Sequence, residues 1–144
     1  MNIVLSMLWL FVANILITLA GIVHTIYNWK VLRMESPKGT KPSKVLAYKC
    51  TETYHPLYKI ILFPVFSYIY LLQTNHENLL QEALIIAISW RLITIIVDLI
   101  GWVLIKHSWH MTFKEMYIDY QPGISLIYIS IFISPFIAFI IISS

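Results

Sequence analysis

The chain has 144 residues, of which 59% are hydrophobic and 12% charged, whereas a soluble domain usually carries about twice that charged fraction. This composition excludes an ordinary water-soluble domain and predicts an integral membrane protein. The length accommodates about four helical spans of roughly 20 residues each, with nothing left for a separate soluble domain.

Four apolar stretches predict transmembrane helices. The first covers about residues 3–27, and its apolar run is too long for the core of a signal peptide, so we expect a retained helix. The others cover about residues 56–73, 79–105 and 123–142, lengths that favour helices over barrel strands. The predicted fold is therefore all-α: a single membrane domain, 1–144, built as a four-transmembrane-helix bundle with a basic link at 28–55.

The basic residues predict an orientation. Seven of the ten lie between the first two spans or at the edge of the second, namely Lys30, Arg33, Lys38, Lys41, Lys44, Lys49 and Lys59. The last link adds Lys106 and Lys114, whereas the middle link has none. Because cytoplasmic loops carry an excess of Lys and Arg, we expect both basic links in the cytoplasm and both termini outside a plasma (inner) membrane.

The basic link also offers candidate ligands for anionic lipid headgroups or a phosphate: Lys38, Lys41, Lys44 and Lys49. Each basic residue near an anionic membrane surface contributes roughly 1 kcal/mol. The alternative is that these lysines are solvated and only set the topology. A nucleic-acid partner is not expected, because the link must lie against the membrane.

Two charges interrupt the third span. Arg91, Thr94 and Asp98 advance by three and four residues, so they share one helical face. A direct Arg91–Asp98 bond is not expected, because seven residues rise roughly 10.5 Å. A charge that faces lipid at mid-membrane is costly, so we expect this face to meet protein or a wet cavity.

The first span has a polar face that includes Asn14 and Thr18 and continues through Gly21, Thr25 and Asn28. Small and polar residues allow close helix packing in membranes, so we predict that the first and third spans pack through their polar faces. Two interpretations stay open: the charges only fix the helix register, or they form a proton or ion path or a binding site.

Four of the five histidines are expected at the cytoplasmic edge and are candidate catalytic residues: His24, His55, His107 and His110, with His76 on the outer side. His107 and His110 are three apart, close enough on a helix to hold a metal ion with Glu115. The pair in KHSWHMTFKE resembles one fragment of the histidine boxes of membrane desaturases and hydroxylases, which carry several boxes on longer chains. A metal-free acid–base or headgroup site, or interfacial histidines without chemistry, are the alternatives.

Three classes of function remain. The small size and the absence of a complete catalytic motif favour a non-enzymatic accessory, stabilising or immunity-type partner in a membrane complex. The second class is a homo-oligomeric ion or proton channel or carrier that uses Arg91 and Asp98. The third is a lipid-acting enzyme with a histidine cluster at the cytoplasmic edge. The stretch MTFKEMYIDYQPGISLIYISIFISP resembles small membrane proteins of Gram-positive bacteria, which implies no particular activity.

Overall fold

The computed structural model describes residues 2–74 and 78–144, and His76 therefore lies outside the described residues. The protein is 78% helical, and the described residues contain no strand. Four helices are long and apolar enough to cross a membrane: α1 (Ile3–Lys30), α3 (His55–Leu72), α4 (Leu79–Asp98) with its π-helical continuation η3 (Leu99–Leu104), and α6 (Gly123–Ser143). They lie where the sequence predicts four spans. The shorter elements are η1 (Pro42–Lys44), α2 (Leu46–Glu52) and α5 (Phe113–Tyr117).

Local sequence explains where several helices begin. The Asn2 side chain caps α1 by accepting a hydrogen bond from the Leu5 amide at 3.1 Å, which satisfies one of the free amides of the first turn. Pro56 occupies the first turn of α3, where its missing amide costs nothing. Thr112 and Glu115 form a capping box that starts α5.

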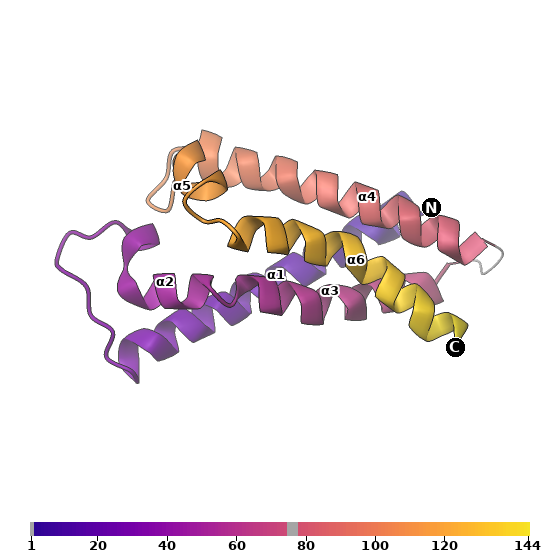
Figure 1. Ribbon diagram of the computed structural model, residues 1–144, viewed down its shortest axis with the longest axis horizontal. Coiled ribbons are helices and arrows are strands. Elements are labelled where there is room, and N and C mark those ends of the chain that lie inside the picture. The colour runs from indigo at the N-terminus through magenta and orange to yellow at the C-terminus, as the bar shows by residue number, and fades with distance from the viewer. Residues whose placement is uncertain (1, 75–77) are drawn as a thin grey trace.

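The long helices pack mainly through α3 and α6. α3 lies against α6 and α1, and α6 also lies against α4 (Figure 1). The Trp90 ring of α4 stacks edge-on against Phe63 and Tyr70 of α3, with ring centroids 5.9 and 6.3 Å apart. Its indole nitrogen donates to the Ser6 hydroxyl at 2.9 Å, so α4 meets α1 near the beginning of α1.

The prediction that the first and third spans pack through their polar faces is wrong. α1 packs instead against α3 and α2, and the polar face of α4 meets α6. Helical periodicity correctly placed each set of residues on one side of its helix. It carries no information about which neighbouring helix covers that side.

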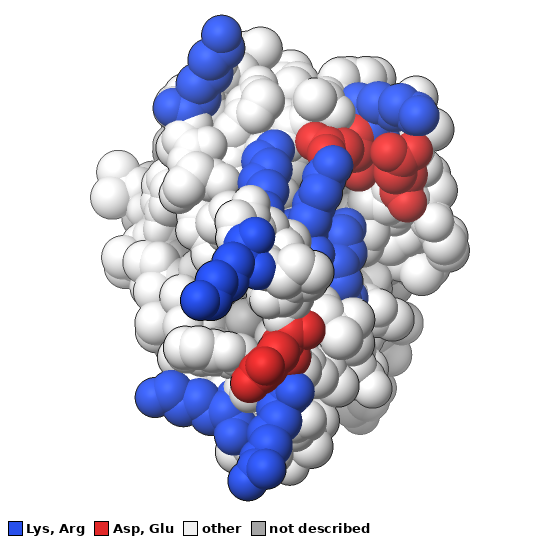
Figure 2. Space-filling model, turned by 90° about the vertical axis from the view of Figure 1, so that its left-hand side faces the viewer, with Lys and Arg blue, Asp and Glu red and all other residues white. Residues whose placement is uncertain are grey.

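The two basic links lie at the same end of the long helices, together with α2 and α5 (Figure 1). α1 begins and α6 ends at the opposite end. Viewed onto the first end, the surface displays Lys and Arg side chains with a few carboxylates among them (Figure 2). The uneven distribution of charge along the sequence is thus an uneven distribution between the two ends of the molecule.

Candidate functional site

Lys59 is a buried charge inside the helical core. It lies four residues after the start of α3 and is only 9% exposed. Its ammonium donates to Asn14 Oδ1 of α1 at 2.7 Å and lies 5.0 Å from the centre of the Phe63 ring. The sequence analysis counted Lys59 only among the basic residues that set the orientation. Its burial could have been expected from its position inside the predicted second span, four residues after His55 and three after Pro56.

Asp98, the last residue of α4, is half-buried. The Tyr128 hydroxyl of α6 donates to its Oδ2 at 3.2 Å, and its charge interacts with that of Lys59. Thr94, one turn earlier, is 4% exposed, and its hydroxyl has no hydrogen-bond partner among the described residues. Asp98 therefore finds its partner on the fourth long helix and not on α1, as the sequence had suggested.

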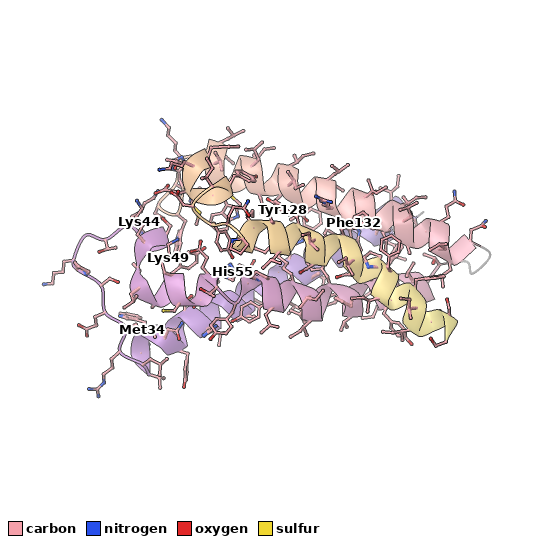
Figure 3. All side chains as sticks on the ribbon, viewed as in Figure 1. Met34, Lys44, Lys49, His55, Tyr128 and Phe132 are labelled. Carbon is pink, nitrogen blue, oxygen red and sulfur yellow. The ribbon has the colours of Figure 1, made fainter. Side chains whose placement is uncertain are left out.

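Arg91 is exposed at the middle of its helix, 12 residues after Leu79 and 13 before Leu104. Its guanidinium lies 5.7 Å from the centre of the Phe132 ring of α6, and Figure 3 shows Phe132 and Tyr128 on α6. Within the described parts of the chain, Arg91 forms no ion pair. The described residues of this chain therefore do not cover Arg91, and the expectation that its face meets protein or a wet cavity stays a prediction.

Exposed apolar side chains lie near Arg91 along α4 and near Phe132 along α6. On α4 these are Leu84, Ile88 and Leu92, which are 45%, 46% and 53% exposed. On α6, Ile129 and Ile133 flank Phe132 in sequence and are 46% and 40% exposed. We call these five side chains, with Arg91 and Phe132, the Arg91 surface. It is an apolar face with a single cation at its centre.

The polar face of α1 serves two different neighbours. Asn14 contacts Lys59 of α3, whereas the Thr18 hydroxyl is exposed and donates to the Asn14 carbonyl at 2.8 Å. Closer to the basic end, Asn28 and Thr25 each donate to the Thr51 hydroxyl of α2 at 3.1 Å. These hydrogen bonds hold α2 against α1.

The structure brings together two of the four candidate catalytic histidines. His24 Nδ1 shares a hydrogen bond with the Tyr58 hydroxyl, so it joins α1 to α3. The His55 ring lies against Gly21 of α1, where an added Cβ would meet its Nε2 at 3.2 Å. His24 and His55 thus belong to the α1–α3 contact.

The other two histidines do not lie on a helix. The apolar helix ends at Leu104, and His107 and His110 lie in a turn closed by a 3.0 Å bond from the His110 amide to the His107 carbonyl. His107 Nε2 is 2.7 Å from the Gly101 carbonyl, and its Nδ1 accepts from the Trp109 amide at 3.1 Å. Both ring nitrogens of His107 are therefore already hydrogen-bonded.

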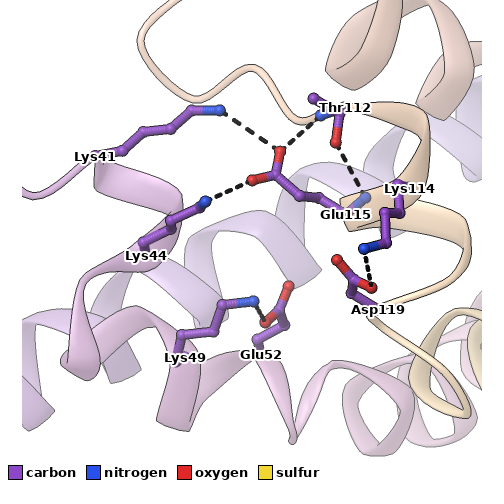
Figure 4. Close-up of polar contacts among 8 residues, drawn as sticks. All are labelled: Lys41, Lys44, Lys49, Glu52, Thr112, Lys114, Glu115 and Asp119. Carbon is purple, nitrogen blue, oxygen red and sulfur yellow. Dashed lines mark hydrogen bonds and ion pairs between the residues drawn. The ribbon is translucent and has the colours of Figure 1, made fainter.

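A metal site at His107, His110 and Glu115 is not supported. No group of three or more His, Cys, Asp or Glu side chains in the described chain is arranged to hold a metal ion. Glu115 is bound by Lys44 at 2.8 Å, Lys41 at 3.8 Å and the Thr112 amide at 2.8 Å (Figure 4). The hydrogen bond from Lys44 is the largest cause that lowers the pKa of Glu115 to about 2, and in return Glu115 raises the pKa of Lys44.

Three of the four lysines proposed to bind headgroups are engaged with carboxylates. Besides the two lysines on Glu115, Lys49 pairs with Glu52 at 2.5 Å (Figure 4), and Lys38 is exposed. A pocket of about 370 Å³ opens at this end, and its lining of mainly apolar side chains, among them Trp29, Tyr48 and Trp109, includes none of the four lysines. The lysines and the pocket therefore do not form one phosphate site.

No protein-family model, characterised protein or solved structure matches this chain, so its function must be inferred from the contacts of its own residues. Those contacts separate the membrane charges into two kinds. Lys59 and Asp98 have hydrogen-bond partners within the core. Arg91 is exposed, and its one contact within residues 2–74 and 78–144 is with an aromatic ring.

Proposed function

We propose that this protein is a non-catalytic membrane subunit that acts by assembling with another membrane-protein chain through the Arg91 surface. The observation that carries the proposal is the exposure of Arg91 at the middle of a helix that is apolar enough to span a membrane. An accessory, stabilising or immunity-type role fits a chain that presents a docking face and whose described residues assemble no catalytic group.

The energetics favour a covered Arg91. A lipid-facing arginine at mid-membrane costs about 3 kcal/mol on insertion scales and over 10 in simulations. The Phe132 ring returns only about 0.5–2 kcal/mol as a cation–π contact. Either end of the helix is about 18 Å or more away along the axis, so snorkelling removes only part of the cost. A partner that covers Arg91 and supplies hydrogen-bond acceptors recovers the remainder.

The proposal includes a four-helix bundle in the plasma membrane with both termini outside. Its support is the gathering of basic residues at the end that holds both links (Figure 2), because basic loops are retained in the cytoplasm. Lys59–Asn14 and Asp98–Tyr128 then act as polar contacts that fix how the helices of the bundle pack.

The two alternative functions have less support. A path through one chain that uses both Arg91 and Asp98 is disfavoured, since Arg91 is exposed while Asp98 is held by Tyr128. A lipid-acting enzyme is disfavoured because both ring nitrogens of His107 are already hydrogen-bonded to backbone groups, and His24 is hydrogen-bonded to Tyr58.

Photo-crosslinking in native membranes tests the proposal. A photoreactive residue in place of Ile88, one turn before Arg91 and 46% exposed, should give protein adducts. The adducts should fall at least tenfold in Arg91→Leu and persist in Arg91→Lys, which keeps the charge. The same probe at Ile15 of α1, which is 58% exposed, is the matched control. Adducts at Ile88 that are unchanged by Arg91→Leu, or no more abundant than at Ile15, contradict the proposal.

A further inference from the structure

We infer that the partner at the Arg91 surface is a transmembrane helix of a different protein, with an Asp or Glu side chain near the middle of its span. The inference rests on the proposed function and specifies the chemistry of the partner. It follows from the carboxylates that this chain itself can offer at the depth of Arg91.

The four helices that could span a membrane contain two carboxylates, Glu82 and Asp98, both on α4. Glu82 lies nine residues before Arg91 and Asp98 seven after it, which is about 13.5 Å and 10.5 Å along the helix axis. Both are also engaged: Tyr70 donates to Glu82, and Tyr128 donates to Asp98. Neither carboxylate lies level with Arg91.

In any homo-oligomer, the difference in depth between Arg91 and the two carboxylates persists. Copies of one chain insert with the same orientation, so rotation about an axis normal to the membrane brings identical residues to the same depth. An α4–α4 contact then places Arg91 beside the partner copy's Arg91, which repels it. A side chain on a helix also leans toward the helix N-terminus, so Arg91 points away from the level of Asp98. A second copy therefore supplies a like charge where an opposite one is needed.

The surroundings of Arg91 select a helix as the source of the anion. Lipid phosphates lie at the membrane surface, about 15 Å from the centre of a hydrocarbon layer roughly 30 Å thick, whereas Arg91 is at the middle of its helix. The Arg91 surface is otherwise formed by Leu and Ile side chains on α4 and α6. An apolar helix with one central carboxylate is complementary to this surface in both shape and charge, since Arg binds carboxylates through paired hydrogen bonds.

A defined peptide probe tests this chemistry. The full-length protein is reconstituted at low density in phosphatidylcholine vesicles at pH 8 with a synthetic Leu/Ala transmembrane peptide of about 24 residues that carries one central Asp. Matched peptides carry Asn or Leu at that position, or the Asp seven residues nearer one end. Energy transfer between labelled peptide and protein measures their association. The central Asp peptide should reach half-maximal transfer at a concentration at least tenfold lower than the other three peptides.

Variants of the protein test whether Arg91 causes the preference for the central Asp peptide. Arg91→Leu should abolish this preference and Arg91→Lys should retain part of it. Arg91→Glu should prefer a peptide with a central Lys instead. Equal association with the Asp and Asn peptides, or a preference that survives Arg91→Leu, overturns the inference. Thr18→Leu, an exposed polar-to-apolar change on α1, is the control that should leave all affinities unchanged.

The mass of the adducts formed from Ile88 in native membranes separates the inference from the proposed function. Arg91-dependent adducts at twice the chain mass of 16.8 kDa keep the proposed function and overturn the inference, because the partner is then a second copy. Arg91-dependent adducts of another mass support both. Adducts that do not depend on Arg91 overturn both.

Discussion

Replacing Asn14 by leucine should destabilise the protein strongly, although leucine is similar in size and better suited to lipid. Asn14 Oδ1 accepts the 2.7 Å hydrogen bond from Lys59, and Lys59 is 9% exposed. The substitution therefore leaves a buried ammonium without its acceptor. Lys59→Met removes the other partner: it leaves a neutral amide oxygen without its donor and takes away the positive charge that interacts with Asp98, which keeps its hydrogen bond from Tyr128.

The two substitutions differ in expected size. Leaving a buried charged donor without its acceptor costs more than about 3 kcal/mol, whereas an unpaired neutral acceptor costs about 1–3 kcal/mol. Hydrogen bonds between neutral groups in membrane proteins average only about 0.6 kcal/mol, so the charge on Lys59 dominates. The double variant with Asn14→Leu and Lys59→Met has neither group and should be more stable than Asn14→Leu alone, because Asp98 keeps its bond from Tyr128.

Unfolding of the purified protein in mixed micelles with increasing SDS, followed by circular dichroism, measures these differences in free energy. Thr18→Leu is the control: it is exposed and only one turn away on α1, so it should change the free energy of unfolding by less than about 0.5 kcal/mol. The reasoning fails if Asn14→Leu behaves like Thr18→Leu. It also fails if the double variant loses the sum of the two single effects, because additive losses indicate that the two side chains do not interact.

Three further predictions concern the basic end and the orientation of the chain in the membrane. Lys44 is the first cause that lowers the pKa of Glu115 from an ordinary 4.5 to about 2. The contribution of Glu115 to stability is therefore full above pH 4.5 and is lost as the pH falls toward 2. Glu115→Gln should remove this pH dependence of stability, measured by amide exchange in α5. Thr51→Val removes the acceptor of two hydrogen bonds from α1, so the half-buried Cys50 of α2 should react faster with a thiol reagent. In sealed cells, an impermeant reagent should label Asn78→Cys, in a variant without Cys50, and should not label the native Cys50; the reverse pattern means that the orientation is inverted.

The length and position of the helices could be predicted from the sequence because both depend on local properties. A hydrophobic run long enough to cross a membrane must form a helix there, since a lipid-exposed backbone has to satisfy its own hydrogen bonds. The ends were less certain: the third span was expected to remain α-helical to about residue 105, but η3 replaces its last turns from Leu99 to Leu104. The metal hypothesis assumed a helix at His107 and His110, where the chain forms a turn instead.

The sequence alone determined that the chain is apolar, helical and basic at one end. Only the tertiary structure decided which charges lie inside the protein and which are exposed, as Lys59 and Arg91 show. Lys59, which the sequence placed at the edge of the second span, is buried against Asn14, whereas Arg91, expected on a face that meets protein or a wet cavity, is exposed over Phe132. Periodicity determines which residues share a face of a helix. Which neighbour covers that face depends on contacts between residues far apart in the chain, here between α1 and α3 and between α4 and α6.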